Sequence, residues 1–390
     1  MTGVREQEPV LTPVQQAAMV NGRSSAAVRL PLAEALALGP GVWDRLAAHS
    51  ERPCPFMTWA WHRAWTAAVE KHEVAAAQAV VLRSAMGDVE AVFPFRLHRT
   101  RFLGASVSTM AWAIGDLGCP DHLDLLASRE AHLDALVAVL EDVPWEIIRL
   151  GNLAEGAPRM EQFCAACERR GWTVQRAPLW PCPYLDLPET WEAYLSTLSA
   201  HGRHAIRRKE RKVQREHHAV VTEYGQGRLD EGLHHLQRLH SLRWEGGGVF
   251  RDRAVERLQR GFAAELAERD QLWLVTLDLD GAPAAAWYGF ALGDTVYHYQ
   301  SGRDPRWERD RVGTVLQGLM IRRAIERGYR RLDFLRGEEP YKAEWTLTTR
   351  RCYEVVVCRA AWRGVALRGF NWIARHPLRQ WLRAQTGSVQ

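Results

Sequence analysis

The sequence of 390 residues contains no apolar run close to the roughly 20 residues that a membrane-spanning helix needs. Its first residues, MTGVREQEPVLTPVQQ, carry two glutamates and lack the apolar stretch of a signal peptide. The seven cysteines are an odd number scattered along the chain, which does not fit the disulfide framework of a secreted domain. We therefore expect a cytoplasmic protein with no transmembrane segment.

Several common catalytic signatures are also absent from the sequence. It contains no G-x-S-x-G, Walker A, G-x-G-x-x-G or H-E-x-x-H motif. Cys164 and Cys167 form a single C-x-x-C at helical spacing, without the second pair that would complete a zinc site. We interpret this pair as the core-facing side of a helix, in preference to a metal or redox role, and we expect no bound metal.

Lysine is scarce, with four residues in the chain, so arginine supplies most of the positive charge. The segment 199–218 contains seven basic and two acidic residues, an excess equal to the formal net charge of +5 of the whole chain. Such a run is either a solvated helical face or a binding surface for a polyanion, such as a coenzyme phosphate or an RNA backbone. Arg203 and Arg207 of this run are candidates to bind a phosphate on the acceptor substrate.

The length, with 47% hydrophobic and 25% charged residues, is typical of a globular protein of two domains. Each half of the chain shows the same order of patterns, namely helices, antiparallel strands, a long helix and a further strand. This order predicts an α/β fold of the mixed or α+β kind. We expect a flexible N-terminal arm (residues 1–27), a first domain (28–182), a second domain (183–360) and a basic amphipathic C-terminal helix (361–390).

The stretch Tyr297–Trp345 carries the most chemical information. A strand runs into a loop, and the loop opens a helix around Arg309, Arg311, Gly313 and Thr314. The N-terminus of a helix presents unpaired N–H groups and a positive dipole end, which favour a phosphate. The stretch therefore suggests a phosphate site, although spacing alone favours a packing role for Gly313.

The motif Y-x-x-G-x-D-P…G-T-x-L…A-I-x-x-G…L-D-F-x-R-G-x-x-x-Y-K-x-x-W in this stretch resembles the CelD-type branch of the GNAT acyltransferases. That branch is similar in turn to the Fem-type aminoacyl transferases of peptidoglycan synthesis. Further matches are TWAWHRAW (58–65), PYLDLPETWEAYLSTLS (183–199) and LHSLRWE, so the resemblance covers most of residues 30–360. It implies two tandem GNAT-like domains, each a mixed, mostly antiparallel sheet flanked by helices, with the acyl-donor groove in the second domain.

The resemblance also implies roles for the residues at the helix start. It makes Val312, Gly313 and Thr314 the counterpart of the GNAT pyrophosphate loop, with Arg309 and Arg311 adding charge-assisted contacts. The loop departs from the usual GNAT pattern, because Arg309 precedes Gly313 by four residues rather than three. This departure leaves room for an activated acyl donor other than coenzyme A.

Acyl transfer to an amine or hydroxyl needs a base, a group that stabilises the oxyanion and an acid for the leaving group. Lys342 is a candidate to stabilise the oxyanion or to bind an acidic acceptor, and Tyr341 is a candidate to protonate the leaving group. Asp333, Glu338 and Glu339 are candidates for the base.

Two tryptophans are further candidates for the acceptor site. Trp61 lies in an aromatic cluster of the first domain, and Trp345 follows the pair Tyr341–Lys342. Indole rings stack well on sugars, but for both residues a place in the hydrophobic core is the favoured interpretation.

We therefore expect an enzyme that transfers an acyl group directly from acyl-coenzyme A, without a metal, to an amine or hydroxyl of a small-molecule or glycan-linked acceptor. One alternative is a Fem-like transferase that takes its acyl group from aminoacyl-tRNA, which the basic run at 199–218 would bind. The other is a non-catalytic module of polysaccharide or envelope biosynthesis, the context of the CelD-type proteins.

Overall fold

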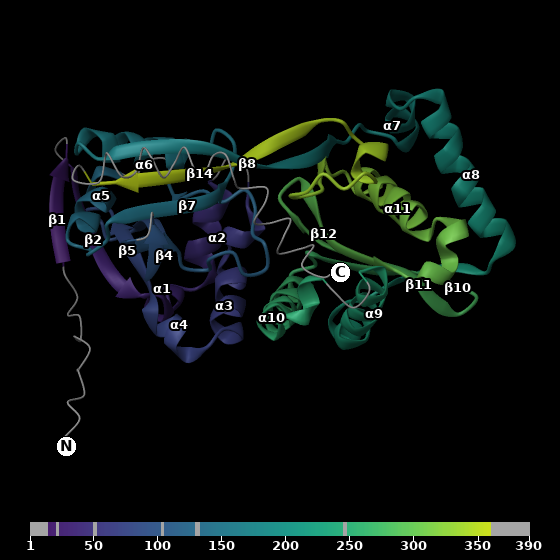
Figure 1. Ribbon diagram of the computed structural model, residues 1–390, viewed down its shortest axis with the longest axis horizontal. Coiled ribbons are helices and arrows are strands. Elements are labelled where there is room, and N and C mark those ends of the chain that lie inside the picture. Colours follow the sequence, from purple (N-terminus) through teal and green to yellow (C-terminus); the bar gives the residue numbers. More distant parts are fainter. Residues whose placement is uncertain are drawn as a thin grey trace, which may run out of the picture.

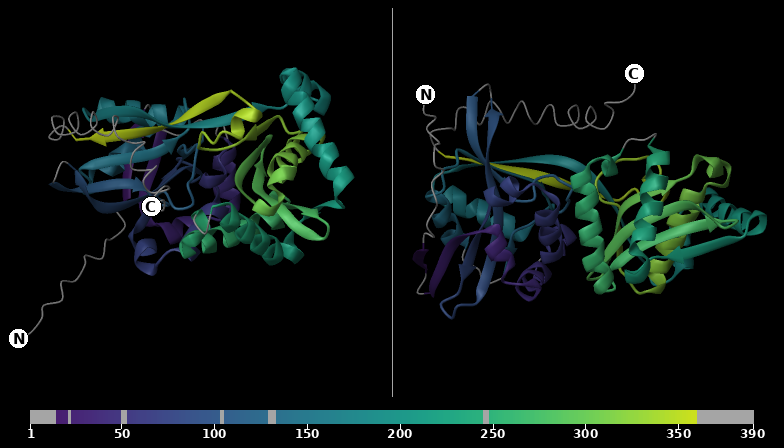
Figure 2. Two further views of the ribbon diagram at one scale, coloured as in Figure 1. Left: turned by 45° about the vertical axis from the view of Figure 1, so that its right-hand side comes forward. Right: turned by 90° about the horizontal axis from the view of Figure 1, so that it is seen from below.

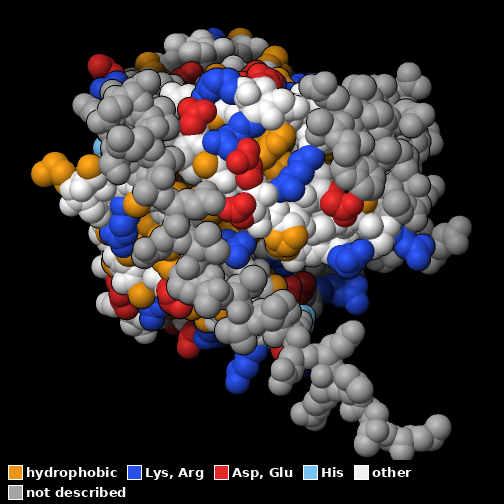
Figure 3. Space-filling view, turned by 90° about the vertical axis from the view of Figure 1, so that its left-hand side faces the viewer, with side chains coloured by type: hydrophobic (Ala, Val, Ile, Leu, Met, Phe, Trp, Pro, Cys, Tyr) orange, Lys and Arg blue, Asp and Glu red, His pale blue; other side chains and the backbone are white. Residues whose placement is uncertain are grey.

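The computed structural model describes residues 15–20, 23–49, 53–102, 105–128, 133–244 and 248–359. The chain forms an elongated molecule in which a first half and a second half follow each other along the long axis (Figure 1). At the end formed by the first half, acidic, basic and apolar side chains are interspersed on the surface (Figure 3).

The first half contains helices on both sides of its strands. Its helices are α1 (Leu32–Leu36), α2 (Pro40–Ala48), α3 (Trp59–Ala68), α4 (Lys71–Ala76), α5 (Leu133–Glu141) and α6 (Pro158–Arg169), with the 3-10 turn η1 (Pro55–Met57). Its strands are β1 (Gln15–Val20), β2 (Arg23–Pro31), β3 (Ala77–Arg83), β4 (Val89–Phe102), β5 (Ala105–Trp112), β6 (Leu126–Ala127), β7 (Ile147–Leu153) and β8 (Thr173–Asp186).

The second half repeats this layout. Its helices are α7 (Trp191–Thr197), α8 (Ala200–Glu216), α9 (Leu229–Arg243), α10 (Arg253–Glu268) and α11 (Val312–Glu326), with the 3-10 turns η2 (Gln226–Arg228), η3 (Val249–Arg251), η4 (Pro305–Asp310) and η5 (Lys342–Glu344). Its strands are β9 (Ala219–Glu223), β10 (Leu272–Leu279), β11 (Ala282–Leu292), β12 (Thr295–Arg303), β13 (Arg331–Asp333) and β14 (Thr349–Cys358).

One sheet runs through both halves, with the strand order β1-β2-β3-β4-β5-β7-β14-β8-β13-β12-β11-β10-β9, and β6 pairs with β4. Its strand pairs are antiparallel except for β5 with β7 and β12 with β13. Each parallel pair is connected by a helix, α5 in the first half and α11 in the second. Helices α9 and α11 cover opposite faces of the second half of the sheet (Figures 1 and 2). The expected fold of two tandem units, each with a mixed, mostly antiparallel sheet flanked by helices, is confirmed.

The two halves exchange strands at their junction. Strand β14 comes from the end of the second half but pairs with β7 and β8 of the first. The last residues of β8 pair with β13 of the second half. The domain boundary that we expected after residue 182 therefore falls inside β8, and residues 349–358 complete the sheet of the first half. Residues 15–20 and 23–27 of the expected N-terminal arm form strands, and the expected C-terminal helix at 361–390 lies outside the described residues.

The interface between the halves is a hydrophobic core. The buried residues of α10, among them Leu258 and Phe262, recur every three or four positions, so they form one face of the helix. That face packs against α3, where the ring of Phe262 meets the ring of Trp61 edge to face, with 4.9 Å between ring centroids. Trp61 is fully buried. The aromatic cluster of α3 therefore joins the halves.

The C-x-x-C pair lies where the sequence predicts. Cys164 and Cys167 are both fully buried on α6, in the core of the first half. Among the described residues, none of the helices combines the length and the apolar character that a bilayer-spanning segment requires.

Candidate active site

Strands β12 and β13 separate soon after they pair. Their parallel register covers only residues 295–297 and 331–333. Beyond this point β12 continues to Arg303, whereas the chain after Asp333 turns away from it. The register with β11 shifts at Tyr299, because Gly289 pairs with His298 and Tyr288 pairs with Gln300. Such a bulge re-aims backbone and side-chain groups, and bulges are frequent next to active sites.

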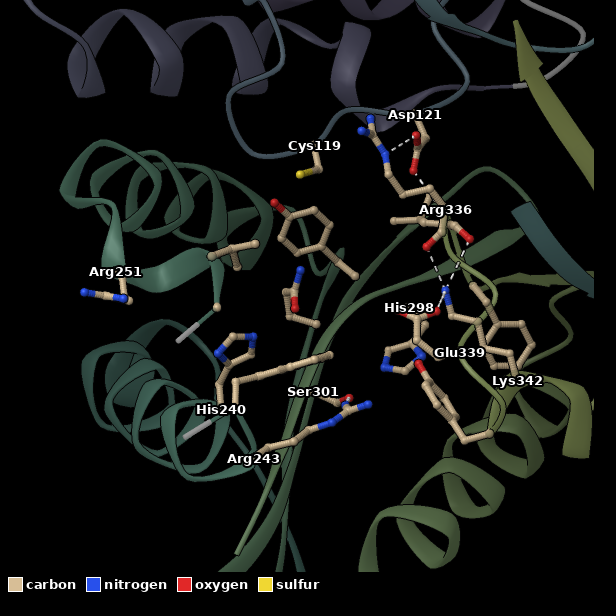
Figure 4. Close-up of a pocket in the computed structure, with 18 residues that line it drawn as sticks. Cys119, Asp121, His240, Arg243, Arg251, His298, Ser301, Arg336, Glu339 and Lys342 are labelled. Carbon is tan, nitrogen blue, oxygen red and sulfur yellow. Dashed lines mark hydrogen bonds and ion pairs between the residues drawn. The ribbon is translucent and has the colours of Figure 1, made fainter. Parts of the chain in front are cut away.

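A groove occupies the space between the separated strands. It consists of two adjoining pockets of about 350 and 340 Å³. The residues that line both pockets are Arg243, Trp244, His298, Ser301, Glu339 and Tyr341. We call one end of the groove the α11 end, which Arg303, Arg311, Gly313 and Thr314 line. We call the other the interdomain end, which includes Cys119, Asp121, His240 and Arg336 (Figure 4).

The α11 end has the features of an anion site. Arg311 precedes the helix with φ of 54°, and its carbonyl accepts hydrogen bonds from the N–H groups of Thr314 and Val315. Within the described chain, this leaves the N–H groups of Val312 and Gly313 as the free donors of the helix start. A Cβ atom added at Gly313 would meet only Arg303 Cδ, at 3.6 Å, so the backbone is open to a ligand there.

His298 lies in the middle of the groove, where the two pockets join. Its side chain is 4% exposed, and its ring stacks on Trp287 at 4.8 Å between centroids. Neither ring nitrogen has a hydrogen-bond partner in the described part of the chain. Burial, reinforced by the charges of Lys342 and Arg243, lowers the pKa of His298 well below its ordinary value. His298 is therefore a neutral imidazole with two buried ring nitrogens that are unpaired within the described chain.

Tyr341 faces His298 across the groove, with 6.3 Å between ring centroids. The Arg243 guanidinium lies over the Tyr341 ring at 5.3 Å and donates a hydrogen bond of 2.7 Å to Ser301 Oγ. Burial raises the pKa of Tyr341. The phenol is therefore protonated at neutral pH and can donate its proton.

Lys342 lines the groove, but its ammonium is already engaged. Nζ donates to the backbone carbonyl of Arg336 at 2.8 Å and contacts Glu339 Oε2 at 2.9 Å. The carbonyls of Leu335 and Gly337 lie at 3.5 and 3.4 Å. Lys342 therefore holds the loop that forms one wall of the groove, and its N–H donors are committed to that loop.

The first half contributes the loop that closes the interdomain end. Arg336 Nε donates to Asp121 Oδ1 at 2.7 Å, and the Arg336 backbone N–H donates to Oδ2 at 2.9 Å. Tyr299 Oη donates to the Gly118 carbonyl at 2.5 Å. Cys119 and Leu335, which line this end, have positive φ angles of 50° and 56°. Residues held in such conformations cluster at functional sites.

Two of the predicted bases do not line the groove. Asp333 is fully buried below it, in contact with Arg350 and with His122 Nε2 at 3.2 Å. Burial alone would raise the pKa of Asp333, but His122 and Arg350 outweigh this effect and hold the pKa below its usual range. Glu338 is exposed outside both pockets, whereas its neighbour Glu339 lines them. Of the three predicted bases, only Glu339 therefore lines the groove.

The predicted substrate-binding residues also lie away from the groove. Arg203 caps its own turn through the Leu198 carbonyl at 2.6 Å, and Arg207 pairs with Glu192. Trp61 is buried between the halves, and Trp345 is 2% exposed in the core beside α11. Both tryptophans thus have the core role that the sequence favours. Of the residues predicted to bind the donor, Arg309 is exposed beside α8, Val312 is buried, and the others line the α11 end.

The groove is also lined by residues that the sequence patterns did not predict. His298 lies within the stretch Tyr297–Trp345, and Arg243 lies within LHSLRWE, a segment that carries the family resemblance. Both residues could therefore have been selected from the sequence. Cys119 and Asp121 come from the first half and had no such signal. They reach the groove only because the two halves pack together.

Comparisons with known proteins agree with this geometry. Residues 200–343 match the family model of the acetyltransferase (GNAT) domain. The chain is similar to the crystal structure of a conserved protein of unknown function from Bacteroides thetaiotaomicron VPI-5482, with a TM-score of 0.51 and 11% identity over 82% of this chain and 98% of that one. It is also similar to FemX, with a TM-score of 0.53 and 10% identity over 81% of this chain and 95% of that one. A comparison with curated proteins found no match. At these identities the likeness to solved structures concerns the fold.

Proposed function

We propose that the protein is a GNAT-type transferase that passes an acyl group from acyl-coenzyme A directly to an amine or hydroxyl acceptor. The observation that carries the proposal is the groove between the diverging strands β12 and β13. It connects an anion site at the start of α11 with a second pocket at the interface of the two halves. A donor and an acceptor can therefore enter from opposite ends and meet at His298.

The donor fits the α11 end through its phosphates and its amide arm. The N–H groups of Val312 and Gly313, with Arg303 and Arg311 beside them, would hold the pyrophosphate. The edge of β12 from residue 298 to 303 has no strand partner on the groove side in the described chain, so its backbone can pair with the amides of the donor arm. This arrangement directs the thioester toward His298.

The groups at the centre of the groove supply the proton transfers. The acceptor nitrogen or oxygen attacks the thioester carbonyl carbon, the new C–N or C–O bond forms, and the C–S bond breaks. A ring nitrogen of the neutral His298 takes the proton of the acceptor, and Tyr341 Oη gives a proton to the departing thiolate. Lys342 positions the loop 335–339, which shapes the wall beside both residues.

Calorimetric titration with acetyl-coenzyme A and longer acyl-coenzyme A esters tests the donor. We expect binding, and we expect Gly313→Asp to weaken it about tenfold or more because the new carboxylate repels the phosphates. An acidic residue in the first turn is favourable for the helix itself, so folding should be preserved. Gly227→Asp, an exposed glycine with open space around it, is the matched control. Failure of every ester to bind, or unchanged affinity in Gly313→Asp, would contradict the proposed donor or its site.

A second candidate donor is aminoacyl-tRNA. A shallow pocket of about 1100 Å³ lies between α8 and the start of α11, and it shares Arg311 with the α11 end of the groove. Two of its arginines, Arg208 and Arg211, have no ion-pair partner in the described chain and lie on the exposed side of α8. A polyanion attached to the donor could continue from the groove onto this surface.

Retention of aminoacylated tRNA at several salt concentrations distinguishes the two donors. An RNA backbone on α8 predicts a steep loss of affinity with salt, and the paired change Arg208→Glu with Arg211→Glu should reduce that slope. Arg99→Glu, an exposed site in the first half, is the control. Absence of retention even at low salt would eliminate tRNA and leave acyl-coenzyme A.

A further inference from the structure

A second cluster of reactive side chains lies below the groove, where β14 of the second half pairs with β8 of the first. Cys182 of β8 and Cys352 of β14 face each other with 3.7 Å between their Sγ atoms. His122, from the loop before β6, places Nδ1 3.7 Å from Cys352 Sγ. All three side chains are buried, with 2% or less of their surface exposed. These three ligand atoms lie within 4.8 Å of one another.

Two of the three spacings between these atoms match the edges of a metal coordination shell. Zinc binds thiolate sulfur at about 2.3 Å and imidazole nitrogen at about 2.0–2.1 Å in a tetrahedron. Such a tetrahedron separates two sulfurs by about 3.8 Å and a sulfur from a nitrogen by about 3.5 Å. The observed separations of 3.7 Å for both pairs agree with these edges. A disulfide bond would instead bring the sulfurs to about 2.05 Å.

The surroundings of His122 give independent support. Its Nε2, on the side of the ring away from the cysteines, lies 3.2 Å from Asp333 Oδ2. Histidines that bind a metal commonly donate their other ring N–H to a carboxylate, which fixes the orientation of the ring. Asp333 is itself held by Arg350 and by the Leu335 backbone N–H at 2.7 Å. The carboxylate is therefore fixed at the position that orients Nδ1 toward the sulfurs.

Two other buried cysteines, Cys164 and Cys167, allow a comparison with cysteines that only fill the hydrophobic core. Cys164 and Cys167 are equally buried on α6, but they lie in the hydrophobic core. Cys182 and Cys352 instead share their site with an imidazole. In such a site thiols make only weak hydrogen bonds, and buried polar groups without good partners are costly. A bound cation removes that cost.

We propose that His122, Cys182 and Cys352 form a zinc site that links the paired strands β8 and β14. Thiolate and imidazole ligands in a closed, buried site are the set that zinc prefers. The fourth position falls to a water molecule, because Asp121 Oδ1, although 3.9 Å from Cys352 Sγ, lies outside this group of three. Asp121, which directly precedes His122 in the chain, holds Arg336 at the interdomain end of the groove, so an ion on His122 would stabilise that wall as well.

Metal analysis of the full-length protein purified under reducing conditions tests the site without any assay of activity. We expect one zinc ion per chain, and we expect Cys182→Ala and Cys352→Ala each to lower zinc affinity about tenfold or more. Cys164→Ala, a buried cysteine outside the cluster, is the matched control and should keep full occupancy. Adding Co²⁺ to metal-free wild-type protein should produce thiolate-to-cobalt absorption and the intense visible bands of a tetrahedral site.

Three results would overturn the proposal. The first is wild-type protein without zinc that also shows no thiolate-to-cobalt absorption when Co²⁺ is added. The second is a zinc affinity in both alanine variants that equals the affinity of the wild type. The third is an intact mass lower by two hydrogen atoms in unreduced protein, with a peptide that links Cys182 to Cys352, because the pair would then be a disulfide. Should the variants fail to fold, the cobalt spectrum of the wild-type protein decides the question alone.

Discussion

In both halves of the molecule two parallel strands diverge, but the gap between them is filled in the first half and open in the second. In the first half, β5 and β7 pair in parallel only at Thr109 with Ile147 and at Met110 with Ile148. Beyond that point Trp112 bridges the strands, because its indole N–H donates to the Gly151 carbonyl at 3.0 Å. In the second half, β12 and β13 separate in the same way and leave a groove.

A segment of the first half also covers the free edge of β7. Leu123 donates its backbone N–H to the Asn152 carbonyl at 2.8 Å, and its carbonyl accepts from Ala154 at 2.9 Å. In the second half, the edge of β12 that faces the gap has no such cover among the described residues. The same topology thus produces a rigid support when the chain fills its own gap, and a ligand site when it does not.

The largest effect on activity should come from removing the imidazole of His298 from the centre of the groove. We expect His298→Ala to lower kcat/KM for acyl transfer about 10²–10⁴-fold, because general acid–base groups contribute on this scale. Donor affinity by calorimetry should change little. His98→Ala, an exposed histidine on β4 of the first half, is the control and should leave the rate unchanged. A variant with full activity would remove His298 from the proton-transfer steps.

Removing the Trp112 side chain, which bridges β5 and β7, should lower the stability of the protein rather than its activity. Trp112 is 3% exposed, so Trp112→Ala should lower the free energy of unfolding by about 3–5 kcal/mol through lost burial and the cavity left behind. Denaturant unfolding measures the loss. Affinity for the acyl donor should be unchanged in the folded fraction. A large fall in affinity would show that the first half does more than support the groove.

The conformation of the loop 335–339, which forms one wall of the groove, should depend on the buried ammonium of Lys342. Lys342→Met keeps the length of the side chain but leaves the carbonyls of residues 335–337 without their donor. We expect a loss of about 2–3 kcal/mol in unfolding free energy, together with weaker donor binding. Lys71→Met, an exposed lysine of the first half, should change neither quantity. Equal stability of the two variants would show that Lys342 does not hold the loop.

The smallest effect concerns pH and the core between the halves. Burial lowers the pKa of His62 to about 4, whereas the unfolded chain binds this proton near the ordinary value of about 6.5. Stability is therefore lost as the pH falls through about 6.5 toward 4, by about 2 kcal/mol between about pH 7 and pH 5. Urea unfolding at both pH values should show a smaller loss in His62→Gln than in the wild type or in His72→Gln. Identical losses would exclude His62 as a source of acid sensitivity.

The sequence predicted those parts of the site that are contiguous in the chain. Gly313, Thr314 and Tyr341 lie along the groove because a strand, a helix start and a loop follow one another within the matched stretch. Asp333, the last residue of β13, does not line the groove, because its carboxylate contacts His122 and Arg350 below it. Local patterns do not reveal which face is the open one.

Contacts between the halves were beyond prediction from sequence patterns. Asp121 reaches Arg336 across 215 positions of the chain. The cysteines that face each other below the groove are 170 positions apart. The mixed fold itself was predictable, because each half repeats its own order of elements. The exchange of β8 and β14 was not, since a strand's pattern does not identify its neighbour.

The place of β14 has a consequence for how the protein is made. In the sheet of the first half, β7 and β8 are not neighbours, and β14 (residues 349–358) occupies the position between them. During synthesis those residues are translated after all of the other described strands. Until β14 is synthesised, β7 and β8 therefore each present an unpaired strand edge. A ribosome stalled anywhere before residue 349 would hold an incomplete sheet that is suited to recruit a chaperone.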